Sequence, residues 1–335
     1  MPNVGEMDLA QQSSREDKDE VHQEKQGLDR RGFLNCMKWA GTGVLWSLSG
    51  GLPHSMKLDK AFAAEQKVEP FTFIQISDSH IGFDKPANPN ALATLREAID
   101  QIKALPHKPA FMIHTGDITH LSKDKEFDDA DQILKEAGLP IFTVPGEHDL
   151  LDDSQGKAYL DRYGRGPLVK ALGAGWYSFD QKGIHYIALV NVTDLKAGGL
   201  GNLGAEQLAW LAADVALLSS STPIVVFAHI PLWTVYAEWG WGTEDGAKAL
   251  ETLKRFGSVT VLNGHIHQIM QKVEGHVAFH TARSTAFPQP VPGTAPSPGP
   301  MKVPPGDLRK YLGIATIDVI HGGEPLAIID RPLAG

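Results

Sequence analysis

The sequence is poor in cysteine, in excess positive charge and in long apolar runs. Its 335 residues include one cysteine, Cys36, which excludes a disulfide framework and any zinc or iron–sulfur site built from several thiolates. The net charge of −9 argues against a protein that coats nucleic acid or binds an acidic membrane surface, because both tasks need a positive field. We therefore expect no nucleic-acid polymer among its partners.

Histidine and carboxylate side chains, by contrast, are plentiful. The chain has 14 histidines and 40 acidic residues, so any bound metal must be held by imidazole and carboxylate groups. The hydrophobic fraction of 42% and the charged fraction of 21% are ordinary for a globular protein and exclude disorder throughout the chain.

The first 63 residues differ in character from the rest. Residues 1–28 are polar and charged, lack apolar periodicity and are predicted to be disordered. Arg30 and Arg31 then precede a weakly apolar stretch at residues 37–52, and Ala61-Phe62-Ala63 supplies a cleavage site of the small-x-small type. This order predicts a twin-arginine signal peptide within residues 1–63. An ordinary charged N-terminal tail is the alternative.

The predicted signal has consequences for location. Its apolar stretch is too short and too rich in glycine, serine and threonine to span a bilayer, so we expect no stable membrane anchor. Cleavage after Ala63 would also remove Cys36 and leave a cysteine-free protein, which suits an oxidising compartment. We expect a periplasmic or secreted protein that has the twin-arginine export machinery as a partner.

From about residue 70 onward, apolar strands alternate with amphipathic helices. The expected helices are 91–105, 125–137, 204–218 and 245–256, and the expected strands are 71–77, 110–115, 140–144, 176–179, 184–192, 223–228, 259–262, 276–281, 311–320 and 326–330. Alternating βαβ units predict a sheet with parallel strands covered by helices, and the added hairpins predict a second, more antiparallel sheet. We expect one α/β domain over residues 64–335, with a proline-rich loop at 287–306.

Five short motifs follow predicted strands. They are Asp78-Ser79-His80, Gly116-Asp117, Gly146-Glu147-His148-Asp149, His229, and Gly264-His265-Ile266-His267. Ligands of α/β proteins bind beyond the carboxyl ends of the strands, so these side chains are expected to converge. Each motif alone is weak evidence, because a single histidine at a strand end is more often a hydrogen-bonded core residue. Together they predict a metal site of mixed imidazole and carboxylate ligands, suited to Zn, Fe or Mn.

In these motifs the chain resembles the calcineurin-like metallophosphoesterase family, whose pattern is D-x-H, G-D, G-N-H-D/E, H and G-H-x-H. The resemblance, nearest to bacterial cyclic-nucleotide phosphodiesterase-like members, implies a four-layer α/β/β/α sandwich of two mixed sheets and a two-metal hydrolase of phosphoesters. It implies that Asp78, His80 and His267 bind the first metal and that His229 and His265 bind the second. Asp117 would bridge the two metals, and His148, oriented by Asp149, would act as an acid or contact the phosphate.

One position departs from the family's pattern. Glu147 stands where the family has asparagine, a neutral oxygen ligand of the second metal. An extra negative charge there should bind the metal more tightly, lower its Lewis acidity and repel a phosphate. We interpret Glu147 as a tolerated oxygen ligand; an altered metal choice or a task other than phosphate chemistry is the alternative.

Four other features are ambiguous. Gly199–Gly204 spell G-x-G-x-x-G, but they follow the strand at a distance, so we interpret them as a loop that leads into a helix. Trp233, Trp239 and Trp241 either pack over a loop or form an apolar wall for the substrate. His120 either faces the site or lies at the surface, and His114 is expected in the core.

The sequence thus predicts an exported phosphohydrolase with two divalent or trivalent metal ions, acting on small phosphodiesters or phosphomonoesters through a metal-bridging hydroxide. His148 would protonate the leaving group. The alternative is a periplasmic metal-binding or sensing protein that keeps the site but hydrolyses little because of Glu147.

Overall fold

A computed structural model describes residues 70–152, 156–164, 175–304, 306–320 and 326–334, together with the backbone of 44–49 and 52–57. The chain divides into two compact units, Met1–Gln66 and Lys67–Gly335. In the first unit, strands β1 (Val44–Ser49) and β2 (Leu52–Lys57) form an antiparallel pair. The predicted disordered region, the arginine pair and the cleavage site lie outside the described residues.

The second unit contains a five-stranded sheet in the order β13-β12-β3-β4-β5. Its members are β3 (Phe71–Ile76), β4 (Met112–His114), β5 (Ile141–Thr143), β12 (Gly313–Val319) and β13 (Ala327–Pro332). Strands β3, β4 and β5 are parallel, whereas β12 is antiparallel to β3. The chain after β3, β4 and β5 therefore leaves the sheet at one edge, as βαβ units require.

A second sheet has six strands in the order β10-β11-β9-β8-β7-β6. Its members are β6 (Tyr177–Gln181), β7 (Ile184–Ala188), β8 (Ile224–Phe227), β9 (Val259–Asn263), β10 (Gln271–Glu274) and β11 (Val277–Thr281). Strands β7, β8, β9 and β11 are parallel, and the hairpins β6–β7 and β10–β11 add an antiparallel strand at each edge.

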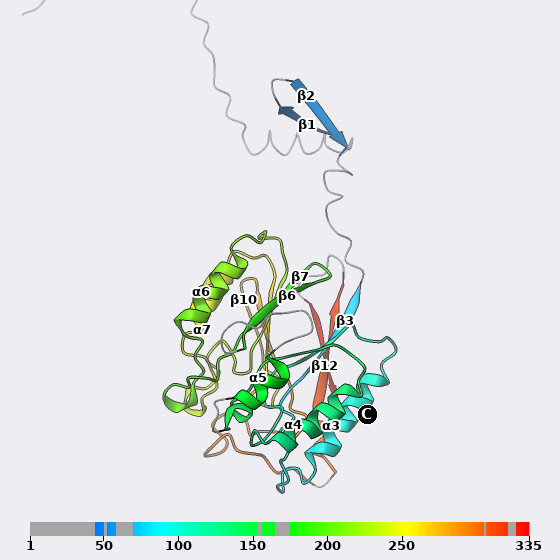
Figure 1. Cartoon of the computed structure of the whole chain (residues 1–335), viewed down its shortest axis with the longest axis vertical. Helices are drawn as coiled ribbons and strands as arrows, with labels where there is room; N and C mark the ends of the chain where they lie inside the picture. The colour runs from blue at the N-terminus through cyan, green and yellow to red at the C-terminus, as the bar shows by residue number, and fades with distance from the viewer. Residues whose placement is uncertain are drawn as a thin grey trace, which may run out of the picture. The chain divides into compact units, whose positions relative to one another are not determined.

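Helices cover the outer faces of the two sheets, and the inner faces pack on each other. Helices α3 (Ala91–Lys103) and α4 (Asp124–Lys135) pack on the five-stranded sheet, and α6 (Gly204–Val215) and α7 (Gly246–Leu253) pack on the six-stranded sheet. Figure 1 shows these two helix pairs on opposite flanks of the strands. Between the sheets lies an aromatic core that includes Phe73, Phe111, Phe142, Phe179 and Tyr186. The predicted four-layer α/β/β/α sandwich is confirmed.

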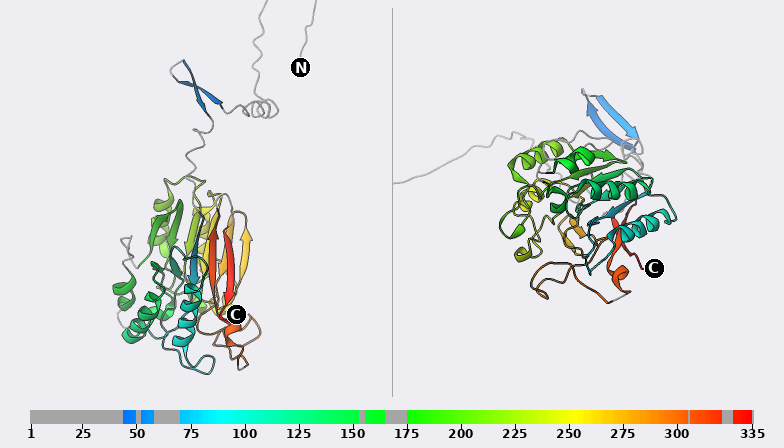
Figure 2. Two further views of the ribbon diagram at one scale, coloured as in Figure 1. Left: turned by 90° about the vertical axis from the view of Figure 1, so that its right-hand side faces the viewer. Right: turned by 60° about the horizontal axis from the view of Figure 1, so that its bottom comes forward.

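Most predicted elements differ from the observed ones by a few residues at their ends. Helices α5 (Lys157–Tyr163) and α8 (Leu308–Tyr311) and strand β10 were not among the predicted elements. Strand β10 is exposed at all four positions, so its sequence has no buried apolar face from which a strand could be predicted. Described residues 282–304 contain neither helix nor strand, and Figure 2 shows this segment, in orange, as a long loop. No helix among the described residues is long and apolar enough to cross a membrane.

Candidate metal centre

The five predicted motifs follow parallel strands of both sheets. Strands β3, β4 and β5 lead into Asp78 and His80, Asp117, and Glu147 and His148, while β8 leads into His229 and β9 into His265 and His267. The two sheets face each other, so their carboxyl edges bring all of these side chains to one place.

Three side chains form what we call the first group: Asp78, His80 and His267. Their ligand atoms lie within 4.8 Å of one another. The Nε2 atoms of His80 and His267 are 3.2 Å apart, and His267 Nε2 lies 3.3 Å from Asp78 Oδ1. All three side chains are buried, with at most 3% of each exposed. This is the ligand set predicted for the first metal.

Glu147, His229 and His265 form the second group, again with ligand atoms within 4.8 Å of one another. Glu147 Oε2 is 3.0 Å from His229 Nε2, and Glu147 Oε1 is 3.1 Å from His265 Nδ1. The glutamate thus presents one oxygen to each histidine of the predicted second site. Its carboxylate occupies the place expected of a ligand, which agrees with our interpretation of the departure at this position.

Asp117 lies between the two groups. Its Oδ2 is 3.4 Å from His80 Nε2 of the first group and 3.5 Å from His229 Nε2 of the second. One carboxylate oxygen therefore faces a histidine of each group. Its other oxygen, Oδ1, accepts a hydrogen bond of 2.9 Å from the backbone N–H of His148, which fixes the orientation of the carboxylate. This is the geometry needed by a residue that is shared between two cations.

Backbone strain is concentrated at these residues. Seven described residues other than glycine have positive φ, and five of them are predicted ligands: Asp78, His80, Asp117, His265 and His267. Left-handed backbone costs about 1–3 kcal/mol for such residues and persists only where the surroundings enforce it. Such strain clusters at functional sites, because it lets consecutive turns aim several side chains at one point.

Two glycines allow the turns to approach closely. A Cβ atom on Gly146 would overlap the side chain and backbone N–H of Asp117, and one on Gly264 would overlap Ser77 and approach Asp78. Any larger residue would push the carboxylates out of place. The prediction that glycines let these side chains converge is therefore confirmed at both positions.

In His229 and in His267, a hydrogen bond to a backbone carbonyl determines which ring nitrogen faces the metal centre. His229 Nδ1 donates to the carbonyl of Thr115 at 2.7 Å, and His267 Nδ1 donates to the carbonyl of Phe287 at 2.5 Å. A carbonyl oxygen can only accept, so each Nδ1 carries the proton and each Nε2 is left to face the carboxylates. Metal-bound histidines in proteins are oriented in the same way.

The resulting arrangement needs a cation. In neutral His229, Nε2 is an acceptor that lies 3.0 Å from another acceptor, Glu147 Oε2. Glu147 Oε2 and His265 Nε2 are both buried without a hydrogen-bond partner. Burial opposes protonation of His229, yet Asp117 and Glu147 raise its pKa well above the usual value. Either a proton or a metal ion must separate such atoms, and the mixed imidazole–carboxylate set fits Zn, Fe or Mn.

Comparison with known proteins agrees with this geometry. The sequence pattern of the calcineurin-like phosphoesterases matches residues 71–269, more than half of the chain. The chain belongs to the calcineurin-like phosphoesterase family. It is therefore a metal-dependent phosphoesterase, of a family whose members use a dinuclear metal site.

Relatives of this phosphoesterase include enzymes with different named activities. The chain is 25% identical to a glycerophosphodiester phosphodiesterase of Enterobacter lignolyticus, over 58% of this chain and 69% of that one. It is 22% identical to a 3′,5′-cyclic-nucleotide phosphodiesterase of a Nostoc species, over 65% and 79%. Its fold is similar to that of a dimetal phosphatase from Danio rerio, with a TM-score of 0.61, 15% identity and coverage of 79% and 98%.

The phosphoesterase carries His148 on a short 3-10 helix, η2 (Glu147–Leu150). His148 Nδ1 donates to the carbonyl of His120 at 2.7 Å, which leaves Nε2 for other partners. Burial opposes a charge on this ring, but Asp117 and Glu147 outweigh it and raise the pKa of His148. An imidazolium in this position could donate a proton to an oxygen of the substrate.

Asp149 does not contact the His148 ring, contrary to our expectation that it would orient it. The buried Asp149 carboxylate instead accepts backbone N–H groups of Ile118, Thr119 and Gly146, at 2.8–3.1 Å. Burial and the nearby Asp117 raise its pKa to about 7. Asp149 therefore joins the turns after β4 and β5, and it positions Asp117 and Glu147 through the backbone.

Of the two interpretations of His120, the structure supports the one in which it faces the site. Its ring stacks on His148, with ring centres 5.0 Å apart, and packs edge-on against His80 at 5.5 Å. Its only sequence signal was its place three residues after Asp117. His114, as expected, is buried in β4, where its Nε2 lies 2.8 Å from Ser79 Oγ.

A cavity of about 370 Å³ opens over the metal ligands. We call it the polar pocket. It is lined by His80, Phe83, Lys85, Asp117, His120, Glu147, His148, His265, Phe287, Gln289, Ser297, Pro298, Gly299 and Pro300. The proline-rich segment thus forms part of its wall.

The other sequence features lie away from this pocket. Trp241 is fully buried and packs on Trp239, while Trp233 packs on Phe279, so the tryptophans serve packing. The N–H groups of Leu203 and Gly204, at the end of G-x-G-x-x-G, bind the carboxylate of Asp245, each at 2.9 Å. This helix start is therefore occupied by a side chain, in agreement with our interpretation of these glycines as a loop.

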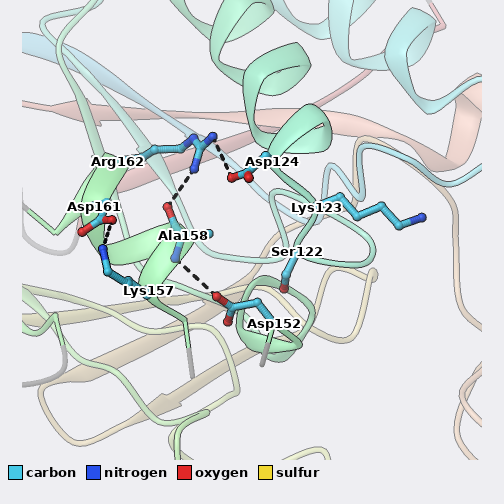
Figure 3. A pocket seen from close by; sticks show the side chains of 8 residues that line it. All are labelled: Ser122, Lys123, Asp124, Asp152, Lys157, Ala158, Asp161 and Arg162. Atoms are coloured by element: carbon cyan, nitrogen blue, oxygen red, sulfur yellow. Dashed lines mark hydrogen bonds and ion pairs between the residues drawn. The ribbon is translucent and has the colours of Figure 1, made fainter. Parts of the chain in front are cut away.

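The structure also has a hollow at the surface, shown in Figure 3. It is lined by Ser122, Lys123, Asp124, Asp152, Lys157, Ala158, Asp161 and Arg162. Lys157 pairs with Asp161 and Arg162 pairs with Asp124, so these cations are already neutralised. Ser122 donates to the carbonyl of His148 at 2.7 Å and accepts the N–H of Leu151 at 2.8 Å. Ser122 thereby holds the backbone of η2 in place.

Proposed function

We propose that this protein hydrolyses small phosphoesters at a dinuclear metal site held by the first group, the second group and Asp117. The observation that carries the proposal is the position of Asp117 Oδ2, 3.4 Å from a histidine of one group and 3.5 Å from a histidine of the other. Ion pairs that only stabilise the fold would not require seven potential metal ligands to converge, nor would they require strained backbone at such residues.

Bound metal ions would supply a water activated at neutral pH and would stabilise charge on the phosphoryl oxygens. The chain's own residues provide the rest of the chemistry. His148 lines the pocket, and Asp117 and Glu147 raise its pKa although burial opposes this; its protonated ring would donate a proton to the departing oxygen. Stacked His120 holds the ring in place through its carbonyl and its own imidazole.

Charge and size favour a small substrate. The chain has a net charge of −9, and Lys85 is the one lysine or arginine among the described residues that line the polar pocket. A cavity of about 370 Å³ is at the lower end of the range typical of small-molecule sites. Long nucleic acids, which need many basic contacts, do not fit this description.

Metal analysis combined with a phosphoester panel tests the proposal. Purified protein is stripped with chelator, reloaded with Mn, Zn or Fe, and assayed on bis(4-nitrophenyl) phosphate and 4-nitrophenyl phosphate. We expect about two metal ions per chain and hydrolysis that requires them. A reloaded protein that binds two metals and cleaves neither ester would overturn the proposal.

That contrary outcome would favour a second candidate, a metal-binding or sensing protein. The observation behind it is Glu147, whose carboxylate faces His229 and His265 and adds a negative charge where the family has a neutral ligand. Such a charge repels a phosphate. A Glu147→Asn variant that gains hydrolysis from an inactive parent would support the sensing role.

We further propose that the protein is exported by the twin-arginine pathway and acts in the periplasm or outside the cell. The support is in the sequence: Arg30-Arg31, the apolar stretch and Ala61-Phe62-Ala63, in that order. Fractionation of cells that express the full chain, with an Arg30→Lys, Arg31→Lys double variant as comparison, tests it. Equal cytosolic retention of both proteins would contradict export.

A further inference from the structure

A second cavity, of about 490 Å³, adjoins the metal ligands. It is lined by Glu147, Leu150, Leu151, Asp152, Val192, Thr193 and Leu195, and we call it the leucine pocket. Among the described residues, Glu147 alone lines both this cavity and the polar pocket. A molecule bound at the metal ligands beside Glu147 can therefore extend into either cavity.

The strand order places the two cavities toward different edges of the six-stranded sheet. The polar pocket is lined by residues that follow β3, β4, β5, β9 and β11, whereas the leucine pocket is lined by residues that follow β5 and β7. Strands β9 and β8, which lead into His265 and His229, lie between β11 and β7 in this sheet. A tetrahedral phosphorus beside Glu147 would thus have one cavity on each side.

The chemistry of the two cavities differs. The polar pocket has Phe83 and Phe287, whose ring centres are 4.3 Å apart, and it has Lys85. It also has Gln289, whose Nε2 donates to the carbonyl of His265 while its buried Oε1 has no hydrogen-bond partner. That oxygen can accept a hydroxyl or amine donor of a ligand.

The leucine pocket offers a chiefly aliphatic lining, with no lysine or arginine among the described residues around it. Leu151 is 55% exposed and Leu195 is 41% exposed, so their apolar surface is open to a ligand. Glu147 would repel a second anionic group in this cavity. Its preferred occupant is therefore an uncharged aliphatic chain.

We infer that the enzyme is a phosphodiesterase for diesters with one aliphatic substituent, which the leucine pocket holds, and one polar or planar substituent, which the polar pocket holds. The inference rests on the proposed function and narrows it from phosphoesters in general to this class. Two separate cavities beside one phosphorus site suit a diester, because a monoester has a single substituent to bind.

The position of His148 indicates which bond breaks. Among the described residues, His148 lines the polar pocket and not the leucine pocket, so the ester oxygen beside it belongs to the polar or planar substituent. Water adds its oxygen to phosphorus, the bond from phosphorus to that substituent breaks, and the leaving oxygen takes the proton as an alcohol. The aliphatic group stays on phosphorus, and the products are an alkyl phosphate and an alcohol.

The test uses a series of methyl, butyl and hexyl 4-nitrophenyl phosphates, in which the leaving group is constant. Each buried methylene should raise kcat/KM about two- to threefold, so hexyl should exceed methyl by more than about tenfold. Calorimetric titration of methyl and hexyl phosphate, the products, into the metal-loaded protein should show the same order of affinity. This second readout does not depend on turnover.

Leu151→Ser and Leu195→Ser remove the aliphatic lining, and Leu217→Ser is the matched control because Leu217 is 98% exposed and distant in sequence from both. We expect the two pocket variants to lose most of the hexyl preference, measured as the ratio of kcat/KM for the hexyl and the methyl ester within each variant. The Leu217 variant should behave like the parent.

The outcomes separate this inference from the function on which it rests. If no ester is cleaved, the proposed function fails. If all esters are cleaved equally, or if the hexyl preference survives both leucine substitutions, the function stands and the inference is overturned.

Discussion

The two halves of the metal centre differ in how they are enclosed. In the first group, Asp78, His80 and His267 are at most 3% exposed, and His267 is tied to the proline-rich segment through the carbonyl of Phe287. In the second group, Glu147 remains 25% exposed and His265 12% exposed, although His229 is fully buried.

This difference assigns different tasks to the two halves. A ligand set that is closed on all sides favours a retained ion, whereas an open one lets water and substrate reach the ion. The second group also adjoins both cavities through Glu147. We therefore expect the first group to anchor a metal and the second to exchange its metal more readily and to meet the substrate.

The largest effect should come from the residue that the two halves share. Asp117→Asn keeps the shape of the side chain but removes the charge that faces both groups, so we expect loss of bound metal from both. Activity on bis(4-nitrophenyl) phosphate should fall by more than about 100-fold, since even partners of metal ligands cost 10- to 100-fold. Metal analysis and kinetics on the same sample provide the measurement.

Asp100→Asn is the matched control for this change, because Asp100 is an exposed residue of α3 whose pair with Lys103 lies at the surface. It should retain the parent's metal content and rate. An Asp117→Asn variant with one tightly bound metal and normal activity would contradict the shared position of this carboxylate.

The next effect tests whether His148 protonates the leaving oxygen. His148→Ala should lower kcat about 100-fold on a diester with an alkoxide leaving group, and much less on a nitrophenyl ester, because a good leaving group needs little protonation. Metal content should stay unchanged. An equal loss on both esters would show that His148 binds the phosphate instead of acting as an acid.

Chelation compares the two halves directly. When EDTA is added to the metal-loaded protein, we expect two phases of metal loss, with the ion of the second group released about tenfold faster because its surroundings admit solvent. The residual metal, measured after gel filtration at successive times, should approach one ion per chain before it falls further. His265→Ala should remove the fast phase of metal loss and leave the slow one. A single phase of metal loss in the parent protein would contradict the difference in exposure between the first and second groups.

The smallest effect concerns the charge at Glu147. Glu147→Asn restores the neutral ligand of the family pattern and should weaken metal binding at the second group by about tenfold, while the first group is unaffected. The rate at saturating metal should rise by a few fold, because less negative charge opposes the phosphate. The control is Glu238→Asn, because Glu238 is exposed and lines neither cavity. If Glu147→Asn and Glu238→Asn have the same metal affinity and the same rate, the charge of Glu147 has no influence.

Local sequence patterns predicted much of this structure. Buried apolar runs such as Phe71–Ile76 and Val259–Asn263 indicated the strands, because burial on both faces leaves a continuous apolar signature. The position of Asp78, His80, Asp117, His229 and His267 directly after such strands was enough to predict that they meet.

Features without an apolar period were not predictable in the same way. The exposed strand β10 depends on pairing with β11, and the tryptophans after β8 are distributed by packing against Phe279 and each other. Asp149 looked like a partner of the neighbouring His148 because the two are adjacent in sequence. Only the fold shows that its oxygens reach the backbone of Ile118 and Thr119 instead.

The sequence by itself therefore determined the alternation of strands and helices and the expectation that histidine and carboxylate side chains meet beyond the strand ends, since these follow from apolar periodicity and from side-chain chemistry; the four layers and the assignment of ligands to two metals were implied by the resemblance to the family. The tertiary structure decided how the ligands divide into a closed and an open group, that His120 joins them, and that two unlike cavities meet at Glu147. These properties depend on distances between segments far apart in the chain, such as Glu147 and His265 or His267 and Phe287. Such distances are set by how two sheets pack and twist on each other, and no local pattern encodes them.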